Sequence, residues 1–129
     1  MTADDPYPLC QGADPDPTPV TFAVPPGTID CHAHIFGPES RYPYSPRRGY
    51  TPPDASLQTF LNLHRTLGGI ERAVLTQPSV YGTDNSCMLD AVDTMGDRFR
   101  AIAAVDEDIS DKELEDLHAR GVRGVRVNL

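Results

Sequence analysis

The chain alternates short apolar runs with longer stretches in which apolar residues recur at helical spacing. The apolar runs have the length of buried strands and cover residues 28–34, 72–77, 100–106 and 122–129. The longer stretches each end at a glycine and cover residues 56–69, 84–96 and 110–121. Strands that are apolar on both faces and alternate with helices predict a parallel sheet covered by helices.

Local signals support the three predicted helices and assign roles to polar residues near them. Ser110 and Glu113 form a capping-box pattern at the start of the third helix. We expect Asp84–Asn85 to cap the second helix. His64 and His118 fall within helices, where we expect them at the edge of the core or in solvent.

Two architectures fit this order, namely a doubly wound sheet and part of a (βα)8 barrel. The nucleotide-binding form of the first has a glycine-rich turn after its first strand, and neither GxGxxG nor GxxxxGK[ST] occurs here. A barrel needs about 250 residues, and the 129 residues of this chain supply half of one. Residues 1–26 hold seven of the thirteen prolines and no lysine or arginine. We therefore expect an α/β fold with an extended, acidic, proline-rich arm at 1–26, followed at 27–129 by the first βαβαβαβ half of a barrel.

Composition limits the classes of partner. A formal net charge of −8 argues against nucleic acid and anionic membranes, because both bind basic surfaces. The N-terminus lacks a secretory signal pattern, and no apolar run approaches the roughly 18–20 residues of a membrane span, so we expect a cytoplasmic protein. Cys10, Cys31 and Cys87 have no CxxC spacing, which predicts three reduced thiols. A small anionic substrate remains compatible with this charge, since a few arginines can hold it locally.

Polar side chains gather at the carboxyl ends of the predicted strands, which in a barrel form the mouth of the active site. His32 and His34 lie two residues apart, so they share one face of the first strand. The ends of the later strands carry Gln77, Ser79, Asp106, Arg126 and Asn128. This pattern predicts a polar site at one end of the sheet.

The residues leave several interpretations of this site open. The histidine pair is either structural, or ligates a divalent metal through neutral imidazoles, or hydrogen-bonds a substrate carbonyl. Arg126 is either a surface charge or the partner of an anion, for which a planar carboxylate fits its fork best. The loop at 40–56 is long and rich in tyrosine, proline and arginine, which is typical of a lid. Tyr50 in this loop either places its hydroxyl over the site or lies at the edge of the site without contacting a ligand.

The segments "DCHAHIFGP", "YTPPDAS", "GTDN" and "GVRGVRVNL" resemble, in this order and spacing, the amidohydrolase-related family and its 2-pyrone-4,6-dicarboxylate lactonase branch. The resemblance implies a (βα)8 barrel that hydrolyses a small carboxylated lactone. It implies that His32 and His34 hold or polarise the substrate carbonyl and that Arg126 binds a substrate carboxylate. It also implies that Tyr50 and Ser79 hydrogen-bond the substrate, and we add Asn128, two residues after Arg126, to this set.

The resemblance also sets what else is expected. The lactonase branch implies no obligatory metal, and the alternative is zinc or another divalent ion at His32 and His34. Other activities of the superfamily, a metal-dependent decarboxylase and a lactone isomerase, stay open, as does a non-catalytic half-barrel that binds a partner. The family's histidine on strand five and its aspartate base on strand eight have no positions here, and Asp106 is the strand-end carboxylate available as a substitute. We therefore expect the C-terminal half of the barrel, or self-association, to cover the open sheet edges.

Overall fold

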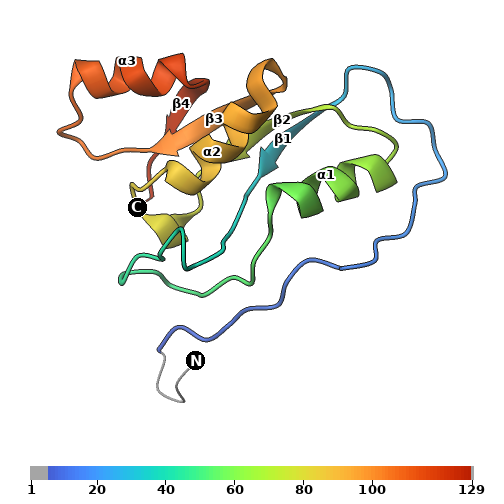
Figure 1. The fold of residues 1–129 in the computed structure, drawn as a ribbon, viewed down its shortest axis with the longest axis horizontal. Coiled ribbons are helices and arrows are strands. Elements are labelled where there is room, and N and C mark those ends of the chain that lie inside the picture. The colour runs from blue at the N-terminus through green and yellow to red at the C-terminus, as the bar shows by residue number, and fades with distance from the viewer. Residues whose placement is uncertain (1–5, 129) are drawn as a thin grey trace.

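The computed structural model describes residues 6–128 and contains a four-stranded parallel sheet with the strand order β1-β2-β3-β4. Figure 1 shows the strands alternating along the chain with the helices α1, α2 and α3. The elements are β1 (Ile29–Ala33), α1 (Leu57–Thr66), β2 (Arg72–Thr76), η1 (Ser79–Tyr81), α2 (Ser86–Met95), η2 (Gly96–Arg98), β3 (Phe99–Ala104), α3 (Asp111–Ala119) and β4 (Val122–Arg126). The predicted βαβαβαβ order and the α/β class are confirmed.

The starts of the helices follow capping chemistry in two of three cases. Ser56 accepts a hydrogen bond from the Thr59 amide at the start of α1, and Ser110 with Glu113 forms the predicted capping box of α3. The expectation for α2 is wrong in part, because Asn85 occupies the N-cap position without capping through its side chain. Its amide instead donates to the Ala104 carbonyl at 2.8 Å and accepts from the Ala104 amide at 2.9 Å, which ties α2 to the end of β3.

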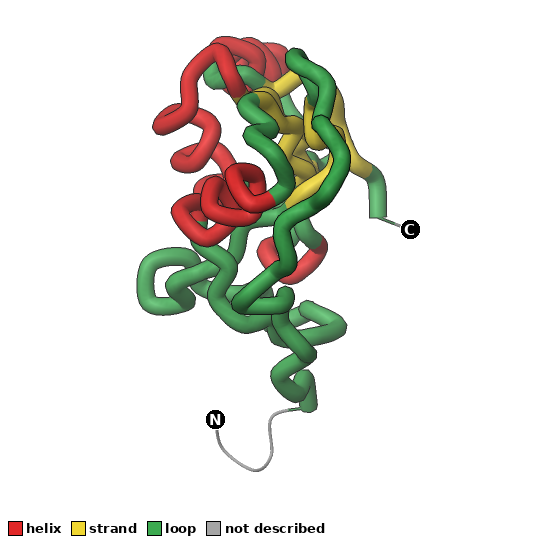
Figure 2. Tube along the Cα trace, turned by 90° about the vertical axis from the view of Figure 1, so that its right-hand side faces the viewer, coloured by secondary structure: helices red, strands yellow, loops and turns green. Residues whose placement is uncertain are grey.

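The hydrophobic core lies between the sheet and the helices. Figure 2 shows the helical turns gathered to one side of the strands. Leu75 and Phe99, from the two central strands, are fully buried against this layer together with Met88 of α2. Burial of each such side chain stabilises the fold by about 1.5–3 kcal/mol. The other face of the sheet carries no helix among the described residues, as expected of half a barrel.

Both sheet edges are open in the described part of the chain. β1 and β4 each have a strand neighbour on one side alone. At the β4 edge, Val125 in the strand and Val127 just after it are 51% and 74% exposed. At the β1 edge, Ile29 is also exposed. Apolar side chains at an unpaired edge are a surface that proteins normally cover.

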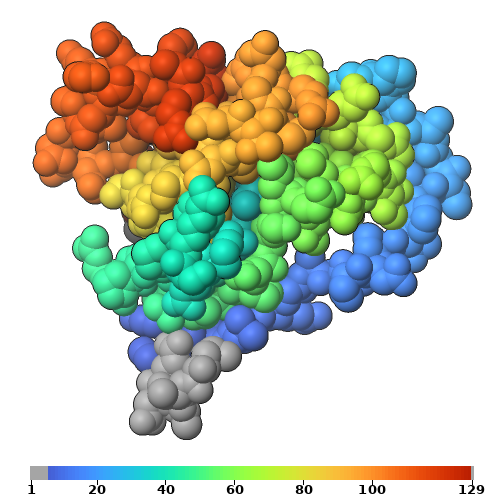
Figure 3. Space-filling view, viewed as in Figure 1, coloured from blue at the N-terminus to red at the C-terminus, as the bar shows by residue number. Residues whose placement is uncertain are grey.

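The N-terminal segment and the loop at 40–56 pack against each other. Figure 3 shows residues 6–26 running along the outside of the molecule to the loop region. Thr51 anchors the contact, because its backbone bonds Pro8 and Cys10 and its hydroxyl donates to the Tyr7 carbonyl. The division of the chain at residue 26 stays a prediction.

The same loop is also fixed to the segment that follows β1. Ala55 in the loop and Phe36 exchange two backbone hydrogen bonds, and the next residue of that segment, Gly37, donates its amide hydrogen to the Tyr81 hydroxyl at 2.8 Å. Gly37 has a φ of 75°, and a Cβ at this position would overlap the Asp54 carboxylate. Hydrogen bonds therefore hold the loop in place beside the carboxyl end of β1.

Within residues 6–128, no helix has the length and apolar character needed to cross a membrane. The cytoplasmic location inferred from the sequence stays a prediction.

Candidate active site

A register shift in β1 decides where the two histidines point. Asp30 pairs with Ala73 and Ala33 pairs with Leu75, so three steps along β1 match two steps along β2. Asp30 and Ala33 therefore share the core-facing side, although their spacing would put them on opposite sides of a regular strand. His32 and His34 flank Ala33, and the shift thus directs both toward the face without helices.

His34 is held by the neighbouring strand. Its Nδ1 lies 2.7 Å from the Thr76 carbonyl oxygen, and since a carbonyl can only accept, Nδ1 carries the hydrogen and donates. The neutral ring then has its lone pair on Nε2. Burial lowers the pKa of His34 below 6.5, and the nearby charges of His32 and Arg126 lower it further, against the opposing effect of the Thr76 hydrogen bond. His32 lies beside it with the ring centroids 5.2 Å apart.

Arg126 approaches the same place from the other edge of the sheet. It pairs with Ala104 at the end of β3 and lies on the face that Gly124 shares with Ile102, opposite the core. Its Nη1 donates to the Gln77 carbonyl at 3.0 Å, and its Nε donates to Asn128 Oδ1 at 2.7 Å. Among the described residues no carboxylate pairs with this guanidinium, so its charge is available to an anion.

The structure thus brings His32, His34, Arg126 and Asn128 to one end of the helix-free face. The neutral form of His34 accepts a hydrogen bond or ligates a metal through Nε2, whereas donation from Nε2 to a substrate carbonyl requires the imidazolium. The two imidazoles would supply two ligands to a divalent ion, and the described residues contain no group of three or more potential ligands.

The sequence also placed Ser79, Tyr50 and Gln77 at this end of the sheet, and for Ser79 and Tyr50 contact with a substrate stays a prediction. Ser79 is exposed at the start of η1, and half-buried Tyr50 packs against the hydrophobic core. The Gln77 side chain is fully buried and donates to the carbonyls of Gly82 and Asp84, so it holds the turn after β2 while its own carbonyl receives Arg126.

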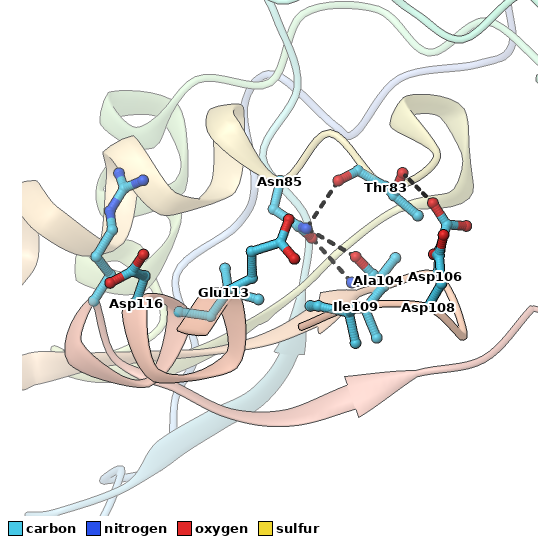
Figure 4. A pocket seen from close by; sticks show the side chains of 11 residues that line it. Thr83, Asn85, Ala104, Asp106, Asp108, Ile109, Glu113 and Asp116 are labelled. Atoms are coloured by element: carbon cyan, nitrogen blue, oxygen red, sulfur yellow. Dashed lines mark hydrogen bonds between the residues drawn. The ribbon is translucent and has the colours of Figure 1, made fainter. Parts of the chain in front are cut away.

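Asp106 lines a different cavity. This cavity of about 440 Å³ lies between α3, the end of β3 and the segment that leads into α2, and it is lined by several acidic side chains. Figure 4 shows Asp106 turned toward Thr83, whose hydroxyl donates to it at 3.4 Å. Neither His32 nor His34 lines this cavity, so the geometry gives no support to Asp106 as a substitute base.

The pairing of Asp30 with His64, next to the histidine pair, was not identified from the sequence. His118 is exposed as expected, but His64 is 1% exposed, so the expectation of a core-edge or solvated position is wrong for it. Nε2 of His64 lies 3.0 Å from Oδ2 of Asp30, and the other oxygen of Asp30 accepts from the His32 amide at 3.2 Å. The available signals were a carboxylate inside an apolar strand and a histidine on the apolar side of a helix.

Comparison with known proteins finds relatives over most of the chain. It is 45% identical over 119 residues to 4-sulfomuconolactone hydrolase of Rhizobium radiobacter, covering 92% of this chain and 40% of that protein. It is 43% identical over 113 residues to 2-pyrone-4,6-dicarboxylate hydrolase of Comamonas testosteroni, covering 88% and 37%. It is 31% identical over 118 residues to D-galactarolactone isomerase of Agrobacterium fabrum, covering 90% and 38%.

A solved structure agrees with these relatives. The probable 2-pyrone-4,6-dicarboxylic acid hydrolase of Acinetobacter baumannii, with citric acid bound, superposes with a TM-score of 0.72 at 36% identity, covering 78% of this chain and 37% of the other. The chain therefore spans about two fifths of the length of the curated relatives it matches. A family profile described as amidohydrolase matches residues 29–129. The chain belongs to the amidohydrolase family and presents the first four strands of its barrel.

Proposed function

We propose that this chain is the N-terminal half of a hydrolase that opens a small cyclic lactone carrying carboxylates, such as 2-pyrone-4,6-dicarboxylate. The observation that carries the proposal is Arg126, whose guanidinium has no carboxylate partner among the described residues and lies near His34. The names of the two hydrolase relatives support the lactone class. Citric acid in the Acinetobacter baumannii structure supports a preference of this fold for carboxylates.

In the proposed reaction, a substrate carboxylate binds the free edge of the Arg126 guanidinium. The lactone carbonyl oxygen then accepts hydrogen bonds from the imidazoles of His32 and His34, which stabilise the oxyanion that forms there. His34 must be protonated to donate from Nε2, and the negative charge of a dicarboxylate next to the ring favours this form. Ser79, Tyr50 and Asn128 remain candidate contacts to the substrate.

The nucleophile in this scheme is water. Its oxygen attacks the carbonyl carbon while a base removes its proton, and collapse of the tetrahedral intermediate breaks the bond to the ring oxygen. The ring oxygen takes up a proton, and the product carries one more carboxylate and one hydroxyl. We assign the base to the part of the barrel that this chain does not span, as the resemblance implies, because Asp106 lies in the cavity beside α3.

The partner that completes the site is the C-terminal half of the barrel. Exposed Val125 and Val127 beside the open edge of β4 support this part of the proposal. No metal is obligatory in the proposed reaction. If a divalent ion is bound, His32 and His34 fit as two of its ligands, because the donation from His34 Nδ1 to Thr76 leaves Nε2 free, and the ion would polarise the carbonyl.

The test compares this chain with a completed protein, in which Leu129 is followed by the remaining C-terminal part of the Rhizobium radiobacter relative. We expect the completed protein, of about 290 residues by the size of a barrel with its arm, to hydrolyse 2-pyrone-4,6-dicarboxylate. The 129-residue chain should show no turnover above background, because general-base assistance alone contributes about 10²–10⁴ in rate. Hydrolysis by the short chain that disappears in Asp106→Asn would refute the assignment of the base.

The isomerase relative supports one alternative, in which the same site moves the lactone bond between hydroxyls of a sugar acid. Proton NMR of the product separates the two reactions, since hydrolysis yields an open-chain acid and isomerisation yields a second lactone. Elemental analysis separates both from a metal-dependent decarboxylase. Stoichiometric zinc or manganese that is lost in His32→Ala, together with release of carbon dioxide, would favour the decarboxylase.

A further inference from the structure

The β1 irregularity leaves a backbone group that the sheet does not use. Between Asp30 and Ala33, β1 has one more residue than β2, so the amide of an intervening residue cannot join the ladder. The Asp30 carboxylate accepts the amide hydrogen of His32 at 3.2 Å through Oδ1. This bond gives the His32 amide an acceptor inside the irregular stretch.

His64 fixes that carboxylate from the helix layer. Its Nε2 lies 3.0 Å from Asp30 Oδ2, and its side chain is 2% exposed. Phe60 packs against it, with the ring centroids 4.0 Å apart and the ring planes tilted by 55°. Nδ1 of His64 is buried without a hydrogen-bond partner among the described residues, which matches the tautomer that carries its hydrogen on Nε2 and donates it to Asp30.

We propose that Asp30 is a positioning residue, locked by His64, that holds the β1 register shift and so directs His32 and His34 into the active site. Without the shift the two histidines would occupy the same side of β1 as Asp30, facing the helices. The pair of half-buried Asp30 and buried His64 thus acts through the backbone of His32 and touches no substrate. The inference deepens the proposed function and rests on it for its kinetic consequence, whereas its structural consequence stands alone.

Histidine side-chain NMR tests the structural consequence on the 129-residue chain, which contains four histidines and can be fully assigned. At neutral pH the wild type should show His34 with its hydrogen on Nδ1 and His64 with its hydrogen on Nε2. Asp30→Ala should return His34 to a mixture of tautomers and expose the His32 amide to hydrogen exchange. Asp30→Asn keeps an oxygen acceptor for that amide and should preserve the wild-type His34 signal.

Loss of Asp30 alone leaves His64 buried without its partner, which destabilises the fold by itself. The double variant Asp30→Ala/His64→Leu removes both polar groups and should fold while His34 still shows the mixed signal. Asp93→Ala is the matched control, because it removes an exposed carboxylate paired with Arg120 at 2.6 Å and should leave every histidine signal unchanged. A folded double variant with wild-type signals from His32 and His34 would overturn the proposal.

Kinetics provide the second arm. In the completed protein, Asp30→Ala/His64→Leu should lower kcat about 10²-fold, since a shift of about 1 Å in a catalytic group has an effect of that size. KM should change little, because Arg126 is untouched. A rise in KM of about 10²-fold with kcat unchanged would contradict a positioning role. Absence of lactonase activity in the unmutated completed protein would refute the proposed function and leave the NMR result to decide the role of Asp30.

Discussion

Replacing Arg126 with methionine gives the sharpest test of how the site holds an anion. Methionine keeps an unbranched side chain and removes the guanidinium, whose Nε and Nη1 already bond Asn128 and Gln77. These bonds orient the remaining N–H groups for a substrate carboxylate before it arrives. A hydrogen bond to a charged group contributes about 1.5–3 kcal/mol, and about 1.4 kcal/mol corresponds to a tenfold change in Kd. We therefore expect Arg126→Met to weaken the binding of 2-pyrone-4,6-dicarboxylate about 10- to 100-fold.

Isothermal titration of the completed protein measures this loss directly. Arg126→Lys should recover part of the affinity, because it restores the charge without the planar fork. Arg123→Met is the control on the same strand, since Arg123 donates to the carbonyls of His118 and Val122 and contacts α3 instead of the site. Equal affinity of the wild type and Arg126→Met, or an equal loss in Arg123→Met, would show that the anion binds elsewhere.

Three further outcomes follow from contacts described above. Burial lowers the pKa of His34 below 6.5, so the unfolded chain takes up a proton at higher pH than the native chain does. The free energy of unfolding should therefore fall as the pH decreases below about 6.5, and His34→Gln should flatten this slope in urea titrations. Val125→Thr/Val127→Thr should shift the isolated chain toward monomer in sedimentation velocity, and an unchanged distribution would show that these side chains do not drive association. Gly37→Ala should destabilise the native state by about 1–2 kcal/mol, because the position has a positive φ and a Cβ there would displace the Asp54 carboxylate, and thermal unfolding would reveal it.

The element order could be predicted because periodicity and caps are local properties. The runs at 72–77 and 122–129 carry their strand signal within a few residues, and Ser110 with Glu113 marks a helix start by itself. The meeting of His32, His34 and Arg126 could also be predicted, since the carboxyl ends of parallel strands lie at one edge of a sheet.

The register shift and the Asp30–His64 pair could not be predicted in this way. Strict alternation places Asp30 on the side of His32, and only the pairing with Ala73 and Leu75 reveals the extra residue. The partner of Asp30 lies 34 residues away on a helix, so no local pattern connects the two. The prediction that the Asn85 side chain caps α2 was wrong for the same reason. That side chain hydrogen-bonds the backbone of the distant Ala104 instead of an amide of its own helix.

The bracing of the loop at 40–56 bears on the thermodynamics and kinetics of ligand capture. The loop is tied to the Val80 carbonyl through the Ser45 amide on one side and, through Thr51, to the N-terminal segment on the other. A segment that is already ordered loses little conformational entropy when a ligand arrives, so more of the contact energy remains as affinity. Association then needs no slow closing step, and a single exponential phase that is linear in ligand concentration is expected in stopped-flow binding. Selectivity would come from the fixed shape of this loop, and ligands too bulky for it would be excluded at the first encounter.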